Sequence, residues 1–145
     1  MRVIIQRVTE ASVIINQKLH SSINQGLLCF VGFCDSDTKE DFKWSINKIL
    51  KLKLFENNFS IEDIDGELLV VSQFTLFASI KKGNKPSWSR AAKPHLAEIF
   101  YNEFVNICKD KTANKTQTGI FGSDMKVESI NDGPVTLILD TKKRE

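Results

Sequence analysis

The feature that most constrains this chain is a short apolar run, residues 68–71 (LLVV), that passes directly into polar residues. Consecutive apolar side chains of this kind predict a strand buried on both faces of a sheet. Ser72, Gln73 and Thr75 follow at its end. Because buried polar groups cost free energy unless they meet a partner or a ligand, this strand end is a candidate site. The alternative is that Ser72 and Thr75 only satisfy backbone groups there.

Short runs rich in β-branched or apolar residues recur along the chain, and segments with helical spacing separate them. The runs predict strands at residues 1–8, 11–15, 27–33, 125–130 and 135–139. This alternation predicts an α/β fold with a mixed sheet and two main helices. Gly32, inside the third run, indicates a bulge or a close approach of another backbone segment.

Two helices are expected where apolar residues recur every three or four positions. The apolar stripes are Phe42, Ile46, Ile49 and Leu50 in the first helix, and Leu96, Ile99, Phe100, Phe104 and Ile107 in the second. Asp37 is the expected N-cap of the first helix, with Glu40 three residues later as in a capping box. Pro94 fits the first turn of the second helix.

Three connecting segments carry their own expectations. Residues 52–55 alternate and predict a short strand, and the polar residues 109–118 predict an exposed loop. Residues 131–134 (NDGP) separate two strands, and the simplest interpretation is a hairpin turn. Gly133 precedes Pro134, and an X–Pro bond adopts the cis form at modest cost. Such a joint also leaves main-chain carbonyls unshielded, which makes it a candidate recognition surface.

Composition excludes several classes of protein. With 145 residues and 41% hydrophobic content, residues 1–145 are expected to form one domain with its own core. A net charge of +2 gives no argument for nucleic-acid binding by overall charge. Cys29, Cys34 and Cys108 lack CxxC spacing, which disfavours a disulfide framework or a zinc site and suits a reducing compartment. No signal peptide or membrane span is recognisable, so a cytoplasmic location is expected.

The segment after the strand end, residues 79–95, is basic and contains no acidic residue. Its basic residues are Lys81, Lys82, Lys85, Arg90 and Lys93, and Trp88 lies among them. A basic loop with one aromatic, beside a polar strand end, suits a phosphate backbone with a stacked base. The simpler interpretation is that these lysines are only solvated.

Familiar catalytic arrangements are missing from the sequence. His20 and His95 lie far apart and outside metal-binding patterns, which disfavours both a hydrolytic metal and a Ser-His-Asp triad. Phosphate-loop, nucleophile-elbow and dinucleotide-binding motifs do not occur, so no cofactor is expected. An enzyme with this sequence must rely on backbone donors and on groups of its substrate.

Two segments resemble the signature motifs of the D-aminoacyl-tRNA deacylase family, also called the D-Tyr-tRNA deacylase family. They are residues 70–78 (VVSQFTLFA) and residues 131–136 (NDGPVT), in the family's order and separation. The resemblance extends over almost the whole chain and includes residues 6–13, 82–88 and 116–127. The departures lie in Ser79, Trp88, Ser129 and a shortened loop at residues 56–60.

This resemblance implies an activity and an assembly. It implies hydrolysis of the ester between a D-amino acid and the terminal adenosine of tRNA, and removal of mischarged glycine. It also implies a homodimer with a three-layer fold, in which two mixed sheets pack together, the helices lie outside, and each active site is completed by the other subunit. Assistance from the 2′-hydroxyl of the tRNA is implied as well, which agrees with the missing histidine base.

The resemblance also implies roles for individual residues. The residues implied to line the catalytic pocket are Ser72, Gln73, Phe74 and Thr75, with nearby amides stabilising the oxyanion. Those implied to select the D form are Gly133 and Pro134, as a cis dipeptide reaching across the dimer, and Arg7, which holds that dipeptide. Contacts with the adenosine are expected from Phe121, Gly122 and Met125, and further tRNA contacts from Lys81, Lys82, Lys85 and Arg90.

Two other functions stay open at the level of the sequence. The first is a tRNA- or nucleic-acid-binding module without catalysis that uses residues 81–93. The second is a relative with the opposite dipeptide geometry, which would accept an L-amino acid such as L-alanine on the wrong tRNA. The sequence of residues 131–136 favours the cis class, again by resemblance.

Overall fold

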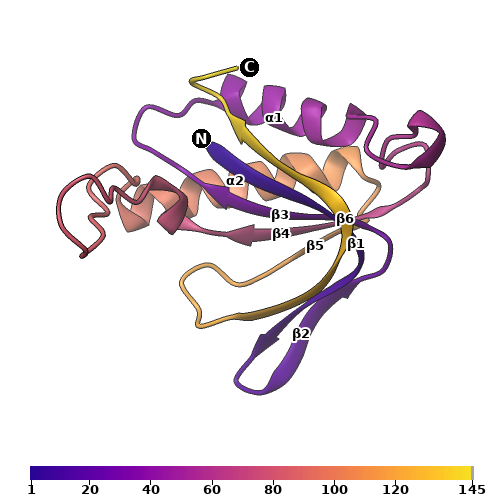
Figure 1. The fold of residues 1–145 in the computed structure, drawn as a ribbon, viewed down its shortest axis with the longest axis horizontal. Helices are drawn as coiled ribbons and strands as arrows, with labels where there is room; N and C mark the ends of the chain where they lie inside the picture. The colour runs from indigo at the N-terminus through magenta and orange to yellow at the C-terminus, as the bar shows by residue number, and fades with distance from the viewer. Residues whose placement is uncertain (145) are drawn as a thin grey trace.

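One curved sheet carries two helices on one of its faces in the computed structural model, which describes residues 1–144 (Figure 1). The strands are β1 (Arg2–Ile15), β2 (Lys18–Ile23), β3 (Gly26–Gly32), β4 (Glu67–Ser72), β5 (Thr116–Thr118) and β6 (Lys126–Asp140). The helices are α1 (Lys39–Lys51) and α2 (Pro94–Lys111), and the short 3₁₀ turns are η1 (Glu56–Asn58) and η2 (Phe74–Phe77).

The strand β1 organises the sheet because it is paired along both edges. Along one edge its first half pairs with β3 and its second half with β2, and β6 runs antiparallel along the other edge. The strands β3, β4 and β5 are parallel, which confirms the predicted mixed sheet. Because β4 is paired on both sides, residues 68–71 are at most 2% exposed, as the apolar run predicts.

A register shift near Thr9 lets β1 contribute to two cores. Before the shift, Val3 and Ile5 join the large core under the helices. After it, Ala11 and Val13 join a smaller cluster on the opposite side of the sheet. A one-residue slip in a strand exchanges the faces to which its side chains point. Odd-numbered residues of β1 therefore face the large core before the shift and the smaller cluster after it. The strand β2 and the adjoining part of β6 bend away from the helices (Figure 1).

Both helices pack on the same face of the sheet, so one chain forms two layers, and the three-layer arrangement implied for the homodimer stays a prediction. Phe33 and Phe42 meet edge to face there, with ring centroids 5.6 Å apart. The buried face of α2 differs from the predicted apolar stripe, because Ile99 is 48% exposed whereas Tyr101 and Val105 are buried. Neither helix in residues 1–144 has the length and apolar character needed to cross a membrane.

The start of α1 differs by one residue from the sequence expectation. Its N-cap is Thr38, which forms a capping box with Asp41. Asp37, the expected cap, instead pairs with the buried N-terminal ammonium of Met1. Asp and Thr are both good N-caps, so local sequence cannot decide between them, and the contact between Asp37 and Met1 is long-range.

Three connecting segments also depart from expectation. Residues 52–55 form no strand, and Phe55 makes only an isolated bridge to Phe59. The expected loop at residues 109–118 contains the end of α2 and all of β5, which adds an edge strand beside β4. The expected hairpin turn at residues 131–134 is also wrong, because β6 stays antiparallel to β1 on both sides of it.

Candidate functional site

The end of β4 turns into η2 at residues 72–77, which we call the corner. The amide of Gln73 still donates to a β3 carbonyl at 2.7 Å, and the 3₁₀ turn begins at the next residue. Ser72, Gln73 and Thr75 are partly buried, whereas Phe74 is 55% exposed. The four predicted pocket residues are therefore neighbours where a buried strand reaches the surface.

Gly32, at the end of β3, allows the corner to approach that strand closely. A Cβ added to Gly32 would lie 2.7 Å from the carbonyl oxygen of Gln73 and 3.2 Å from Cβ of Leu76. The predicted close approach of a second backbone segment is confirmed. The corner is consequently packed in a fixed position against the sheet.

The hydrogen bonds inside the corner leave Thr75 without a base. The side-chain amide of Gln73 donates to the Thr75 hydroxyl, and no histidine or carboxylate of residues 1–144 bonds to that hydroxyl. A hydroxyl nucleophile needs such a partner. The amides of Phe74 and Thr75 begin η2, and the first N–H groups of a helix have no acceptor within it. The corner can therefore offer backbone donors to a developing oxyanion.

Arg2, on β1, contacts and stabilises the corner, a role that the sequence does not indicate. Its Nη1 donates to the carbonyl of Leu76 at 3.0 Å, and its guanidinium lies 4.9 Å from the ring centre of Phe77. Its Nε pairs with Asp140 of β6 at 2.8 Å. Burial of Asp140 is the largest single influence and opposes ionisation. The hydrogen bonds from Arg2 and from the Lys142 amide, with the positive charges of Arg2 and the N-terminus, together outweigh it and lower the pKa of this carboxyl.

The basic loop, residues 79–93, leaves the corner and returns beside β3. Ser79 and Ser87 exchange two backbone hydrogen bonds of 2.8 and 2.9 Å, which close the loop at its base. Arg90 donates to the carbonyl of Ala78 at 2.6 Å. The predicted tRNA-contacting residues Lys81, Lys82 and Lys85 are all exposed on this loop.

The opposite side of β4 carries residues 119–125, directly after β5, which we call the adenosine segment because three of its residues are predicted to contact adenosine. Its first amide, at Gly119, donates to the carbonyl of Val70 at 3.2 Å, so the segment lies beside the last part of β4. Tyr101 donates to the same carbonyl at 2.9 Å and packs against Phe121 with ring centroids 5.9 Å apart. Burial raises the pKa of Tyr101 well above its usual value, so this donor stays protonated.

The three residues predicted to contact adenosine occupy this segment together. Phe121 and Met125 are partly buried, and Gly122 between them is exposed with a φ of 76°, a conformation that favours glycine. A Cβ added to Gly119 would lie 2.4 Å from the sulfur of Met125, so the segment is folded tightly against itself.

A second region, residues 132–135, leaves the β1–β6 ladder and is called the bulge. Gln6 pairs with Thr136 and Val8 pairs with Asn131, so the whole bulge lies opposite the single residue Arg7. Its Gly133–Pro134 peptide bond is cis. Apart from its two chain neighbours, no atom of residues 1–144 lies within 4 Å of a Cβ added to Gly133.

Arg7 and Asn131 hold the base of the bulge. The Nε of Arg7 donates to the carbonyl of Asp132 at 3.2 Å and pairs with its carboxylate at 2.9 Å. Its Nη2 donates to the carbonyl of Gly133 at 3.3 Å, and its Nη1 donates to that of Leu54. Asn131 donates to the carbonyls of Arg7 and Val135 at 2.9 and 3.2 Å. The predicted grouping of Arg7 with the Gly-Pro joint is therefore present in the structure.

Within one chain, however, the bulge does not reach the corner. The corner adjoins the first residues of β1, the bulge faces Arg7 further along that strand, and β1 and β3 separate β6 from β4. Strand rise and spacing place the two regions roughly 20 Å apart. Joint action of the two regions requires a second copy of the chain.

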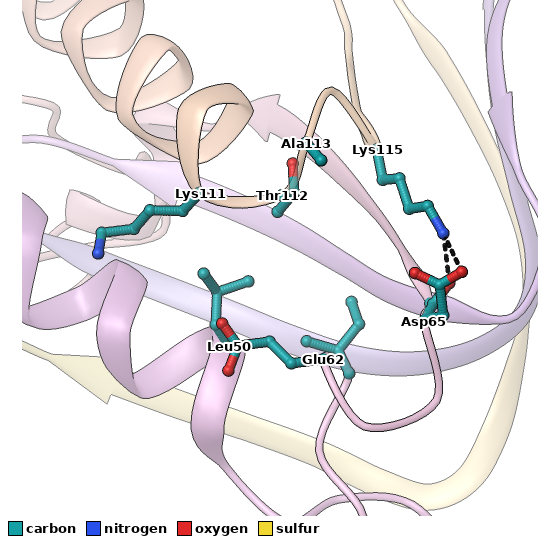
Figure 2. Close-up of a pocket in the computed structure, with 9 residues that line it drawn as sticks. Leu50, Glu62, Asp65, Lys111, Thr112, Ala113 and Lys115 are labelled. Atoms are coloured by element: carbon teal, nitrogen blue, oxygen red, sulfur yellow. Dashed lines mark hydrogen bonds and ion pairs between the residues drawn. The ribbon is translucent and has the colours of Figure 1, made fainter.

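Two hollows of the surface lie outside the four residues predicted to line the catalytic pocket. Figure 2 shows one of about 260 Å³ between the ends of α1 and α2, where Lys115 pairs with Asp65. It lies at the start of β4 rather than at its end, and none of the predicted site residues lines it. A second hollow, of about 920 Å³, follows β6 and reaches Arg2 and Leu76.

Comparison with known proteins gives a match over nearly the whole chain. A family model described as D-Tyr-tRNA(Tyr) deacylase matches residues 4–140. Two relatives named D-aminoacyl-tRNA deacylase, from Flavobacterium psychrophilum and Flavobacterium johnsoniae, are 51% and 52% identical over 150 residues. In both cases the match covers 100% of this chain and 100% of the relative.

Solved structures give the same fold. A structure titled c-Myc DNA Unwinding Element Binding Protein has a TM-score of 0.91 and 37% identity, covering 97% of this chain and 98% of that one. A structure titled as a probable eukaryotic D-amino acid tRNA deacylase has a TM-score of 0.85 at 17% identity, with 95% and 97% coverage. The second likeness concerns the fold alone.

Proposed function

Because this chain belongs to the D-Tyr-tRNA(Tyr) deacylase family and is a hydrolase, we propose that it cleaves the ester of D-aminoacyl-tRNA. The products are a free D-amino acid and tRNA, and mischarged glycyl-tRNA is a further substrate. The observation that carries this proposal is the family match over residues 4–140, which includes both the corner and the bulge. The reaction removes D-amino acids from tRNA in the cytoplasm before translation uses them.

At the corner, water attacks the ester carbonyl with help from the 2′-hydroxyl of the substrate. The amides of Phe74 and Thr75 stabilise the oxyanion, and the 3′-oxygen of adenosine leaves with a proton. The absence of a base on Thr75 in residues 1–144 supports this route over a Thr75 nucleophile. Ser72 and Gln73 line the same surface and orient the ester.

The adenosine of the substrate is proposed to lie against residues 119–125. Phe121 and Met125 offer partly buried apolar surface beside the end of β4, and the exposed backbone at Gly122 leaves room for the base. The bond between Gly119 and Val70 keeps this segment next to the corner. The sugar would then present its ester to Ser72 and Thr75.

Chiral selection is proposed to come from the bulge of a second copy. The carbonyl of Gly133 would lie against the α-carbon of the substrate, where an L side chain clashes and a D side chain points outward. This mechanism rejects one hand of every amino acid without reading its identity. Glycine has no side chain to reject, so it passes. The open surroundings of Gly133 in its own chain fit a role toward another chain.

A homodimer of this kind is supported by an apolar row on the face of the sheet without helices. The register places Val71, Phe30, Ile4 and Ile138 side by side across four strands. Ile138 is 76% exposed at the end of this row. A second sheet packed on this face would cover the row and place the helices of both copies outside.

A deacylation assay on paired substrates tests the proposal. We expect purified protein to release D-tyrosine from D-Tyr-tRNA and to leave L-Tyr-tRNA intact. Equal rates on the two substrates, or none on either, would overturn the assignment. We also expect Thr75→Ala to retain activity, and a covalent Thr75 ester trapped during turnover would refute the proposed route.

A further inference from the structure

Phe74 and Trp88 form an exposed aromatic pair at the mouth of the corner. Their ring centroids are 5.3 Å apart and the planes meet at 75°, an edge-to-face arrangement. Phe74 is 55% exposed and Trp88 is 42% exposed. An edge-to-face pair leaves ring faces available, and such faces bind the flat surface of a nucleic-acid base.

Trp88 is held in place beside Phe74 although it lies on a loop. Trp88 directly follows Ser87, whose two backbone bonds to Ser79 close the loop. Arg90 is bonded to the carbonyl of Ala78, and the amide of Ala92 donates to Phe33 at 2.9 Å beside β3. The pair therefore lies on the β3 side of β4, whereas the adenosine segment lies on the β5 side.

The charge around the pair favours a phosphodiester chain as its ligand. Lys81, Lys82 and Lys85 are exposed on the same loop, and residues 68–97 contain no Asp or Glu. A nucleotide brings a phosphate for these cations as well as a base for the rings. The amino-acid part of the substrate carries an ammonium group, which the exposed lysines of this loop would repel.

We propose that Trp88, with Phe74, is a stacking subsite for an unpaired nucleotide of the tRNA acceptor end that precedes the terminal adenosine. This inference rests on the proposed function, because it takes the corner as the place where the ester lies. The terminal base then binds on one side of the corner and a preceding base on the other.

The kinetic test compares substrates with and without that preceding nucleotide. For Trp88→Ala we expect the KM for D-Tyr-tRNA to rise about tenfold, from the loss of one stacked base, and Trp88→Phe to restore most of it. The KM for D-tyrosyl-adenosine, which lacks the nucleotide, should not change. Ile80→Ala is the matched control, since Ile80 is 76% exposed on the same loop and outside the pair. Equal effects on both substrates, or no effect on either, would overturn the subsite.

A binding measurement separates this inference from the activity. Trp44 and Trp88 are the two tryptophans, so Trp44→Phe leaves Trp88 alone and Trp88→Phe leaves Trp44 alone. We expect the trinucleotide CCA to quench fluorescence in Trp44→Phe and not in Trp88→Phe. Quenching in both, or in neither, would overturn the subsite. Quenching specific to Trp88 in a protein without D-selective hydrolysis would instead overturn the proposed function.

Discussion

The corner packs closely against β3 of its own chain, whereas the bulge contacts the described part of its own chain only at its base. A Cβ at Gly32 would collide with Gln73 in the corner, but a Cβ at Gly133 in the bulge would meet nothing within 4 Å. Both regions are nevertheless held firmly by hydrogen bonds. A segment that is fixed at its base and free at its tip is suited to act on something outside its own chain.

The two regions are also held by the same kind of contact. Arg2 donates to a backbone carbonyl of the corner and pairs with Asp140 of β6. Arg7 donates to backbone carbonyls of the bulge and pairs with Asp132, also of β6. The strand β1 thus positions the proposed catalytic corner near its start and the proposed chiral selection further along, so we expect substitutions to separate the two functions.

The largest effect is expected from Gly32→Ala. The added Cβ must displace Gln73 or Leu76, which moves the corner. We expect kcat/KM on D-Tyr-tRNA to fall more than about 100-fold, as for a displacement near 1 Å in an active site. Overpacking should lower the free energy of unfolding by about 1–3 kcal/mol, measurable by denaturant titration. Wild-type activity would show that the corner is less tightly enclosed than described.

Gly133→Ala makes the same chemical change in the open region. We expect the free energy of unfolding to stay within about 0.5 kcal/mol of wild type, because the methyl group has nothing to contact. Activity on D-Tyr-tRNA should still fall by about tenfold, because the methyl group enters the pocket of the second copy and misplaces the ester. Unchanged rate and selectivity in this variant would contradict the proposed role of the main chain in chiral selection.

Arg7→Met and Arg2→Met should affect different kinetic quantities. Loss of Arg7 removes the hydrogen bonds that hold the bulge, so we expect L-Tyr-tRNA to be hydrolysed measurably. Because the loss also leaves backbone carbonyls without their donor, we expect the free energy of unfolding to fall by about 1–3 kcal/mol. Loss of Arg2 should lower kcat on D-Tyr-tRNA without admitting the L substrate. Lysine at position 7 should rescue only in part, since it cannot reproduce the guanidinium geometry. The same kinetic change in both variants would show that the two regions are not separable.

The smallest effect is expected in the pH dependence of the Arg2–Asp140 pair. Arg2 lowers the pKa of Asp140 in the folded protein, so the pair stabilises the fold above the unfolded-state pKa near ~4 and this contribution is lost as pH falls through the folded value. We expect Asp140→Asn to be less stable than wild type by up to about 1 kcal/mol at pH 7, with the difference vanishing in acid. A difference that does not shrink as the pH is lowered would show that packing rather than charge holds Asp140.

The corner could be predicted from sequence because its signal is local. An apolar run that ends in Ser-Gln locates the end of a buried strand, and Gly32 indicates a close approach. The bulge was placed correctly but given the wrong shape, because Asn-Asp-Gly-Pro is compatible with either a hairpin or an excursion. Only the distant pairing with β1 distinguishes the two.

Other features depend on contacts between residues far apart in sequence. Arg2 bonds to Leu76 and Asp140, and the sequence around residue 2 contains no pattern that indicates either partner. The sequence predicts a loop at the edge strand β5 because its three polar residues are held by pairing with β4 and carry no apolar pattern of their own. The third layer was expected from the assembly of two chains, so one chain by itself cannot contain it.

The pairing of β1 with β6 resumes after residues 132–135 with the strands still antiparallel. The register of β1 with β6 therefore does not depend on the length or sequence of this excursion. Insertions or deletions there would leave the hydrophobic cores intact, so the stereochemical preference proposed for this excursion could evolve, or be engineered, while the rest of the fold stays unchanged.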